Sequence, residues 1–344
     1  MVLLYYTELL PNQQRCQLWI TFKRMENLFG ENYNHINNAS QGDIELNLYC
    51  DEVKDKECPI IKDKWHYFGI LIVPTNIEKI FLVDLLKKRF RVNNLSEVDR
   101  KTEYFPKNNR IVHFHSLGAD TYHIAKRWYD YIRDPKSCDK VYFSILGVNQ
   151  NKLNPESFGN EELFERIYNR FFRTAVIFSI KKYFPGRNII IKNIFHEEGE
   201  QEYHEFFPWH IFYRINEDCE NITCLNKEVS FLNKDHRKNN TANFIQLVDV
   251  ILGSAVNNLH NSTKNEHKVK LTEDFSGLIK RLVESPENPN STYCKDYYKR
   301  MNISFFPKQN INPKDEYLEY KKRMNQFYHG REIVFLNRRQ KRLF

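Results

Sequence analysis

One uninterrupted apolar run, residues 67–73, constrains the fold of this chain more than any other feature. A strand that is apolar at every position, without alternation, is expected where other elements cover both faces of a sheet. An alternating strand over residues 44–50 precedes it, and the charged, proline-containing link between the two indicates a hairpin with a long loop. Further strands are predicted over residues 110–115, 141–148 and 188–195.

Helical periodicity alternates with these strands. The spacing of Thr75 and Glu78 is that of a capping box, and apolar stripes predict helices over residues 75–85, 120–132, 161–184, 241–259 and 272–284. Strands interleaved with helices in this way predict an α/β fold with a mixed sheet flanked by helices. We divide the chain into a helical N-terminal extension (1–40), an α/β domain (41–260) and a helical, basic C-terminal extension (261–344).

The composition restricts the class of protein. Hydrophobic residues make up 41% of the 344 positions, which excludes global disorder, and the net charge of +8 suits an anionic partner such as nucleic acid. An ordinary basic surface accounts for the same charge. The seven cysteines form no CxxC pair, so we expect reduced thiols in a cytoplasmic protein. No apolar run approaches the length of a membrane span, so no membrane association is expected.

Two adjacent carboxylates, Asp51 and Glu52, follow the first strand. Neighbours on a strand point to opposite faces, and Asp51 shares the more polar face with Asn47 and Tyr49, so Asp51 is the preferred site residue. A buried carboxylate requires a compensating group. In a basic chain that group is either a structural Arg or Lys or a divalent metal ion, and a charged hairpin rim is the simplest alternative.

Three further groups could carry chemistry. Glu197 and Glu198 follow the strand 188–195, where a solvated turn is the alternative. Asp249 lies in an otherwise apolar helix and shares a face with Gln246, and a structural cation is as good a partner for it as a metal. His113 and His115 share one face of the predicted strand 110–115 and could bind a transition metal, transfer protons or serve as structural hydrogen-bonding residues.

These carboxylates come from an early strand, a later strand end and a late helix, so they can converge at one edge of the sheet. Mg²⁺ or Mn²⁺ suits such an oxygen-rich site. Two ions about 4 Å apart would activate water and stabilise the leaving oxygen during attack on phosphorus. A zinc hydrolase that uses the histidines on a small substrate is a further alternative.

Two motifs also resemble a known family. The run LYCDEVKD…WHYFGILIVP resembles the signature Y-x-D-E-S-G of the bacterial and phage family called domain of unknown function thirty-eight hundred, of the RNase H-like (retroviral-integrase-like) superfamily. FIQLVDVILGSAV is similar to its l-Q-l-A-D-l-i-a-g signature, and NIFHEEGEQ to its middle acidic strand end, so the resemblance covers about residues 44–260.

The resemblance implies an RNase H-like sheet and a nuclease that cuts DNA or RNA with Mg²⁺ or Mn²⁺, in phage defence or a mobile element. It implies Asp51, Glu197 or Glu198, and Asp249 as metal ligands and catalytic residues. Val112 stands near a position where the family carries a carboxylate. Either His113 or His115 replaces that ligand, Glu103 reaches in, or the chain is a catalytically degenerate subunit that binds nucleic acid or joins a complex.

Basic residues outside these motifs suggest where nucleic acid could bind. Lys181, Lys182 and Arg187, together with Arg338 and Arg339 in the tail, are the candidates for neutralising phosphates. A solvated helical face or a surface for a protein partner explains the same residues. The terminal extensions are the expected location of any protein partner.

Overall fold

The computed structural model describes residues 42–57, 63–97, 106–134, 142–153, 163–204, 207–260, 263–284 and 300–306. The chain divides into two compact units, Met1–Gly42 with Asn154–Arg170, and Asp43–Leu153 with Phe171–Phe344. The predictions for residues 1–40 and for the basic tail lie outside the described residues. The sheet and every site residue discussed below belong to the second unit, as does the part of α6 (Leu163–Tyr183) from Phe171 onward.

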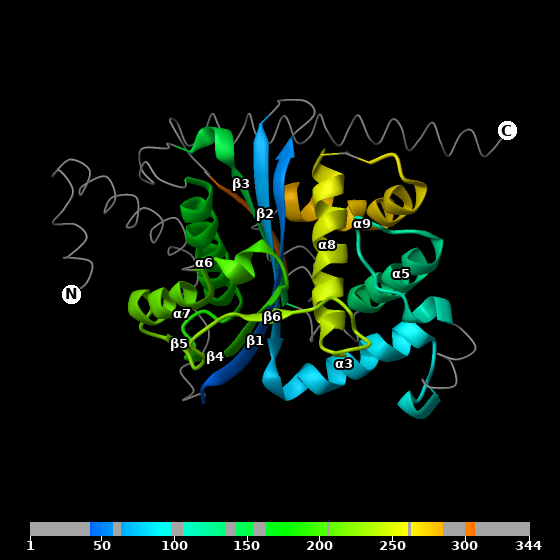
Figure 1. The fold of residues 1–344 in the computed structure, drawn as a ribbon, viewed down its shortest axis with the longest axis horizontal. Helices are drawn as coiled ribbons and strands as arrows, with labels where there is room; N and C mark the ends of the chain where they lie inside the picture. The colour runs from blue at the N-terminus through cyan, green and yellow to red at the C-terminus, as the bar shows by residue number, and fades with distance from the viewer. Residues whose placement is uncertain are drawn as a thin grey trace. The chain divides into compact units, whose positions relative to one another are not determined.

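The described strands form one mixed seven-stranded sheet in the order β5-β4-β1-β2-β3-β7, with β6 beside β4 (Figure 1). Strands β1, β2 and β3 are antiparallel neighbours, β4 is parallel to β1, β5 and β6 are parallel to β4, and β7 is parallel to β3. The strands are β1 (Ile44–Glu57), β2 (Lys64–Pro74), β3 (Tyr142–Asn149), β4 (Ile189–Glu197), β5 (Ile222–Cys224), β6 (Ser230–Leu232) and β7 (Met301–Phe306).

Helices cover both faces of this sheet (Figure 1). One face carries α8 with α3, α5 and α9, and the other carries α6 and α7. The helices are α3 (Thr75–Phe90), α5 (Ala119–Arg133), α6 (Leu163–Tyr183), α7 (Phe207–Asp218), α8 (Ala242–His260) and α9 (Glu266–Glu284), with 3₁₀ turns η1 (Leu95–Glu97), η2 (Pro106–Asn109), η4 (Gln150–Lys152) and η6 (Glu200–Tyr203). None of the described helices has the length and apolar character needed to cross a membrane.

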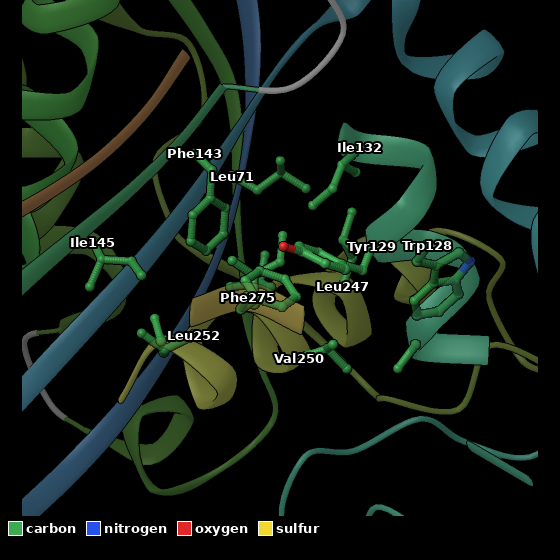
Figure 2. Packing of buried hydrophobic residues seen from close by; sticks show 14 of the residues in the cluster. Leu71, Trp128, Tyr129, Ile132, Phe143, Ile145, Leu247, Val250, Leu252 and Phe275 are labelled. Carbon is green, nitrogen blue, oxygen red and sulfur yellow. The ribbon is translucent and has the colours of Figure 1, made fainter. Parts of the chain in front are cut away.

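Helix α8 lies at the centre of the larger core. Every residue of α8 except Asp249 is buried, because the sheet packs on one side of the helix and α3, α5 and α9 pack around the rest. Figure 2 shows sheet residues Leu71, Phe143 and Ile145 packed with residues of α5, α8 and α9. At Gly69 of β2, an added Cβ would lie 3.2 Å from the Leu252 side chain, so this glycine permits the close approach of α8.

The mixed sheet with flanking helices is therefore confirmed, and so are the helices expected from periodicity. Two local predictions were wrong. Strand β1 does not end at Cys50 but continues to Glu57, because β2 remains paired with it through Val53 and, after an irregularity in the register, Lys56. Residues 110–115 form no strand: the backbone N–H groups of Val112 and Phe114 donate to side chains of α8 rather than to a neighbouring strand.

Candidate functional site

Strands β1 and β4 each send one functional side chain to either face of the sheet. Cys50 of β1 is the register partner of His196 in β4, so the dipeptides Asp51-Glu52 and His196-Glu197 lie at the same end of the two strands. Strand alternation then separates them. Asp51 and Glu197 lie on the face that carries α8, whereas Glu52 and His196 lie on the face that carries α6 and α7.

On the α8 face, three carboxylates converge on one ammonium group, and we call this set the carboxylate centre: Asp51, Glu197, Asp249 and Lys234. The Lys234 Nζ atom lies 4.0 Å from Asp51 Oδ2 and 3.7 Å from Asp249 Oδ1, and it forms a shorter ion pair with Glu197 Oε2. The Glu197 side chain is 27% exposed, while the other three are close to one-tenth exposed. The centre is thus shielded but reachable from solvent beside Glu197.

Lys234 is the one member that the sequence did not indicate. It follows β6, which pairs in parallel with the end of β4 and so delivers the chain to the edge where β4 ends. The Gln246 side-chain amide donates a 2.7 Å hydrogen bond to the Lys234 carbonyl, which fixes the backbone there. Only the parallel pairing of β6 with β4 brings Lys234 to this edge, so the sequence pattern by itself did not indicate it.

The electrostatics of the centre reflect an excess of acids over bases. Burial raises the pKa of Asp51 well above its usual range; Lys234 opposes this, while Asp249 and Glu197 raise it further. Burial would lower the pKa of Lys234, but Asp249, Asp51 and Glu197 together raise it, so the ammonium stays charged. One cation therefore serves three carboxyl groups, and the centre retains an affinity for further positive charge.

Gln246 and Asp249, one turn apart on α8, hold the loop that was expected to be a strand. Gln246 Oε1 accepts from the Val112 backbone N–H at 3.0 Å, and Asp249 Oδ2 accepts from that of Phe114 at 2.6 Å. The buried Arg89 adds a further donor to Gln246 Oε1. At Gly253 an added Cβ would lie 2.3 Å from the Phe114 ring, so the glycine leaves the space in which this loop sits.

The two histidines of this loop are placed differently. His113 Nδ1 lies 3.6 Å from Asp249 Oδ2, and it accepts a 3.0 Å hydrogen bond from the His115 backbone N–H. That bond assigns the ring proton to Nε2, and burial lowers the pKa of His113, so the ring is neutral near pH 7. His115 is exposed, with its ring centroid 6.1 Å from that of His113. His113 thus borders the centre and His115 lies farther out.

The other predicted site residues are not brought to the centre. Exposed Glu198 accepts a hydrogen bond from Asn233 Nδ2 at 2.6 Å. Lys181 and Lys182 lie in the last turn of α6 and Arg187 just before β4, whereas Glu197 ends β4, a strand about 26 Å long at 3.3 Å per residue. Lys182 Nζ there donates to Asn302 Oδ1 at 2.6 Å. Glu103, Arg338 and Arg339 fall outside the described residues.

On the opposite face, Glu52 has two cationic neighbours in the sheet, His196 of β4 and, farther away, Lys54 of β1. His196 Nε2 lies 2.8 Å from Glu52 Oε2, while His196 Nδ1 faces the Glu197 carbonyl at the same distance. Both ring nitrogens therefore face oxygen atoms, an arrangement that favours the protonated ring. Burial would lower the pKa of His196, but Glu52 raises it above its usual value. Burial would raise the pKa of Glu52, but His196 and Lys54 lower it to about 2.

The carboxylate centre suits Mg²⁺ or Mn²⁺ in the chemistry of its donors. Both ions favour carboxylate oxygens, and Mg²⁺ takes them at about 2.0–2.1 Å. The present spacing is set by an ammonium group, and within the described ranges no group of three His, Cys, Asp or Glu side chains is arranged to hold a metal. Three comparisons, with protein-family models, curated proteins and solved structures, found no match to the chain.

Proposed function

We propose that this chain is a metal-dependent nuclease that hydrolyses phosphodiester bonds of DNA or RNA at the carboxylate centre. The observation that carries the proposal is the convergence of Asp51, Glu197 and Asp249, from three elements far apart in the sequence, around a single cation. Partly buried carboxylates repel one another unless cations neutralise them, so an unbalanced cluster beside a solvent opening favours a divalent ion.

The strand order supports an RNase H-like assignment within the α/β class. Three antiparallel strands, β1 to β3, are followed by β4 and β5 on the other side of β1 and parallel to it. The acids lie on β1, at the end of β4 and on α8, in the same order as the three motifs that carry the resemblance. A role in phage defence or a mobile element rests on that resemblance alone.

The side chains of the centre, and those at its border, would have different roles. Asp51, Glu197 and Asp249 would hold Mg²⁺ or Mn²⁺, which when bound supplies a Lewis acid for phosphoryl oxygens and acidifies water. Neutral His113 offers its Nε2–H as a donor at the border of the centre, since its Nδ1 is occupied by the His115 backbone. The Phe114 N–H fixes one oxygen of Asp249, leaving the other directed at the centre.

The direct test is cleavage of labelled single- and double-stranded DNA and RNA with Mg²⁺, Mn²⁺ or EDTA. Asp51→Ala/Asp249→Ala should abolish metal-dependent cutting, and Glu45→Gln, at the other end of β1, should retain it. Glu197→Gln should lose activity and Glu198→Gln should keep it within about tenfold, because only Glu197 contacts Lys234. Cleavage that survives the double substitution would refute the assignment of the centre.

A second candidate function has specific support. The Lys234 ammonium already lies among the carboxylates, and Val112 occupies the position near which a further acid was expected. The chain would then be a catalytically degenerate RNase H-like subunit that binds nucleic acid or joins a complex. Salt-dependent nucleic-acid binding, without metal binding or cleavage by wild type, would favour this candidate.

A further inference from the structure

We propose that Lys234 is a resident cation that takes the place of one of two metal ions, so that the carboxylate centre binds a single divalent cation. This inference deepens the proposed nuclease function and rests on it. It concerns the number of ions that the centre holds and a substrate-facing role for Lys234, neither of which follows from the motifs around Asp51 and Asp249.

Both the backbone carbonyl and the side-chain ammonium of Lys234 have fixed partners. Its carbonyl accepts from Gln246, a residue that is itself fixed by Val112 and Arg89, and its Nζ atom is ion-paired with Glu197. Its side chain is only 9% exposed. A lysine anchored in this way fills a defined position among the carboxylates, whereas a solvated lysine could leave it at little cost.

The Lys234 ammonium lies within hydrogen-bond length of only one of the three carboxylates. Its distances of 4.0 Å to Asp51 Oδ2 and 3.7 Å to Asp249 Oδ1 exceed hydrogen-bond length, so Lys234 attracts these oxygens without occupying them. The other oxygen of each carboxylate is taken by a backbone N–H, of Glu52 and Phe114 respectively. Asp51 Oδ2 and Asp249 Oδ1 are therefore the oxygens that we assign as ligands of one added ion.

The charge balance gives the same number of ions. Counted by formal charge, the three carboxylate groups and one ammonium sum to two negative charges, which one divalent cation would neutralise; such a cation would also oppose the burial that raises the pKa of Asp51. Two divalent cations beside Lys234 would make the centre positive before any phosphate arrived. With one ion bound, the ammonium remains as a fixed positive charge next to the scissile phosphate, where a second metal would otherwise lie.

The number of bound ions tests this directly. Mn²⁺ titration followed by electron paramagnetic resonance and calorimetry should give one ion per wild-type chain. Lys234→Met, of similar length but neutral, should bind two ions with the spectroscopic signature of a coupled pair. Lys234→Arg keeps the charge and should bind one, as should Lys238→Met, the matched control at an exposed position on the same loop.

Each other outcome overturns the proposal in a distinguishable way. Two ions in wild type would show that Lys234 withdraws, and metal-dependent cleavage would then still support the nuclease assignment. A single ion in Lys234→Met would show that the lysine holds no ion position. No Mn²⁺ in wild type, together with no cleavage, would end both proposals, and a gain of binding in Lys234→Met would identify the lysine as the cause.

Discussion

Each face of the sheet holds a buried carboxylate of β1, Asp51 on one face and Glu52 on the other. The two faces differ in how much positive charge lies near that carboxylate. Glu52 meets the imidazolium of His196, with Lys54 at 3.6 Å, and its pKa falls to about 2. Asp51, the preceding residue, shares one ammonium with two other carboxylates, and burial together with their repulsion raises its pKa. On the face of Glu52 the charges balance, and we interpret the Glu52–His196 contact as a structural ion pair. On the face of Asp51 negative charge is in excess, so an added cation would be stabilised most strongly there.

This comparison predicts opposite phenotypes for two adjacent isosteric substitutions. Asp51→Asn should reduce metal-dependent cleavage by about 10³-fold, because it removes several kcal/mol of transition-state stabilisation by the bound ion. It should leave thermal stability unchanged or raised, since the repulsion within the centre falls. Glu52→Gln should retain cleavage within about tenfold in the fraction that is folded. Initial rates of cleavage at saturating Mn²⁺ measure the activity of both variants. Equal losses of activity would contradict the proposed difference between the two faces.

Stability should show the reverse order. Glu52→Gln leaves the buried His196 imidazolium without its carboxylate, so we expect a loss of about 3 kcal/mol in the free energy of unfolding. Urea denaturation measures it, with Asp51→Asn as the matched comparison. The double variant Glu52→Gln/His196→Gln should recover part of the loss, because it removes both charges. No recovery would mean that packing, rather than the ion pair, carries the effect.

The two acids should also give opposite pH dependence. The folded-state pKa of Glu52, about 2, lies below its unfolded value of 4.5, so its contribution is present above pH 4.5 and is lost as the pH falls towards 2. The folded-state pKa of Asp51 is raised, so its ionisation costs stability as the pH rises above the unfolded value of 3.8.

Denaturation curves at a series of pH values check this prediction. Glu52→Gln should flatten the loss of stability below pH 4.5, and Asp51→Asn should remove a decline on the alkaline side of pH 3.8. The contribution of His196 to the free energy of unfolding has the opposite pH dependence to that of Glu52. Because the folded-state pKa of His196 is raised, its contribution is complete below pH 6.5 and is lost as the pH rises through the raised value. Identical profiles for the two acid variants would contradict the comparison.

The sequence predicted the parts of this site that periodicity controls. Alternation alone placed Asp51 and Glu52 on opposite faces of the sheet, and the apolar pattern of residues 241–259 predicted the helix that carries Asp249. Residues 110–115 were misjudged for a physical reason. Val112 and Phe114 have the period of a strand because their N–H groups meet Gln246 and Asp249, and these side chains of α8 take the place of a strand partner.

Lys234 could not be predicted from local pattern. It reaches the centre because β6, three residues long, pairs in parallel with the end of β4, and so short a segment carries almost no periodic signal. Charge adds no information either, since Lys234 is one of 52 basic residues in the chain. The choice between Glu197 and Glu198 likewise depended on the position of that ammonium, which only the tertiary structure supplies.

The smallest expected effect tests how the α8 face depends on its loop. Gly253→Ala would place a Cβ at 2.3 Å from the Phe114 ring, which must move, and the Phe114 N–H that fixes Asp249 moves with it. Overpacking of this kind costs roughly 1–2 kcal/mol in the free energy of unfolding. Mn²⁺ affinity should fall as well, because one oxygen of Asp249 loses its donor, whereas the Glu52–His196 pair across the sheet should be unaffected.

Gly118→Ala is the control, since an added Cβ there meets nothing within 4 Å. A loss of stability in Gly253→Ala with unchanged Mn²⁺ affinity would show that the loop packs against α8 without positioning Asp249.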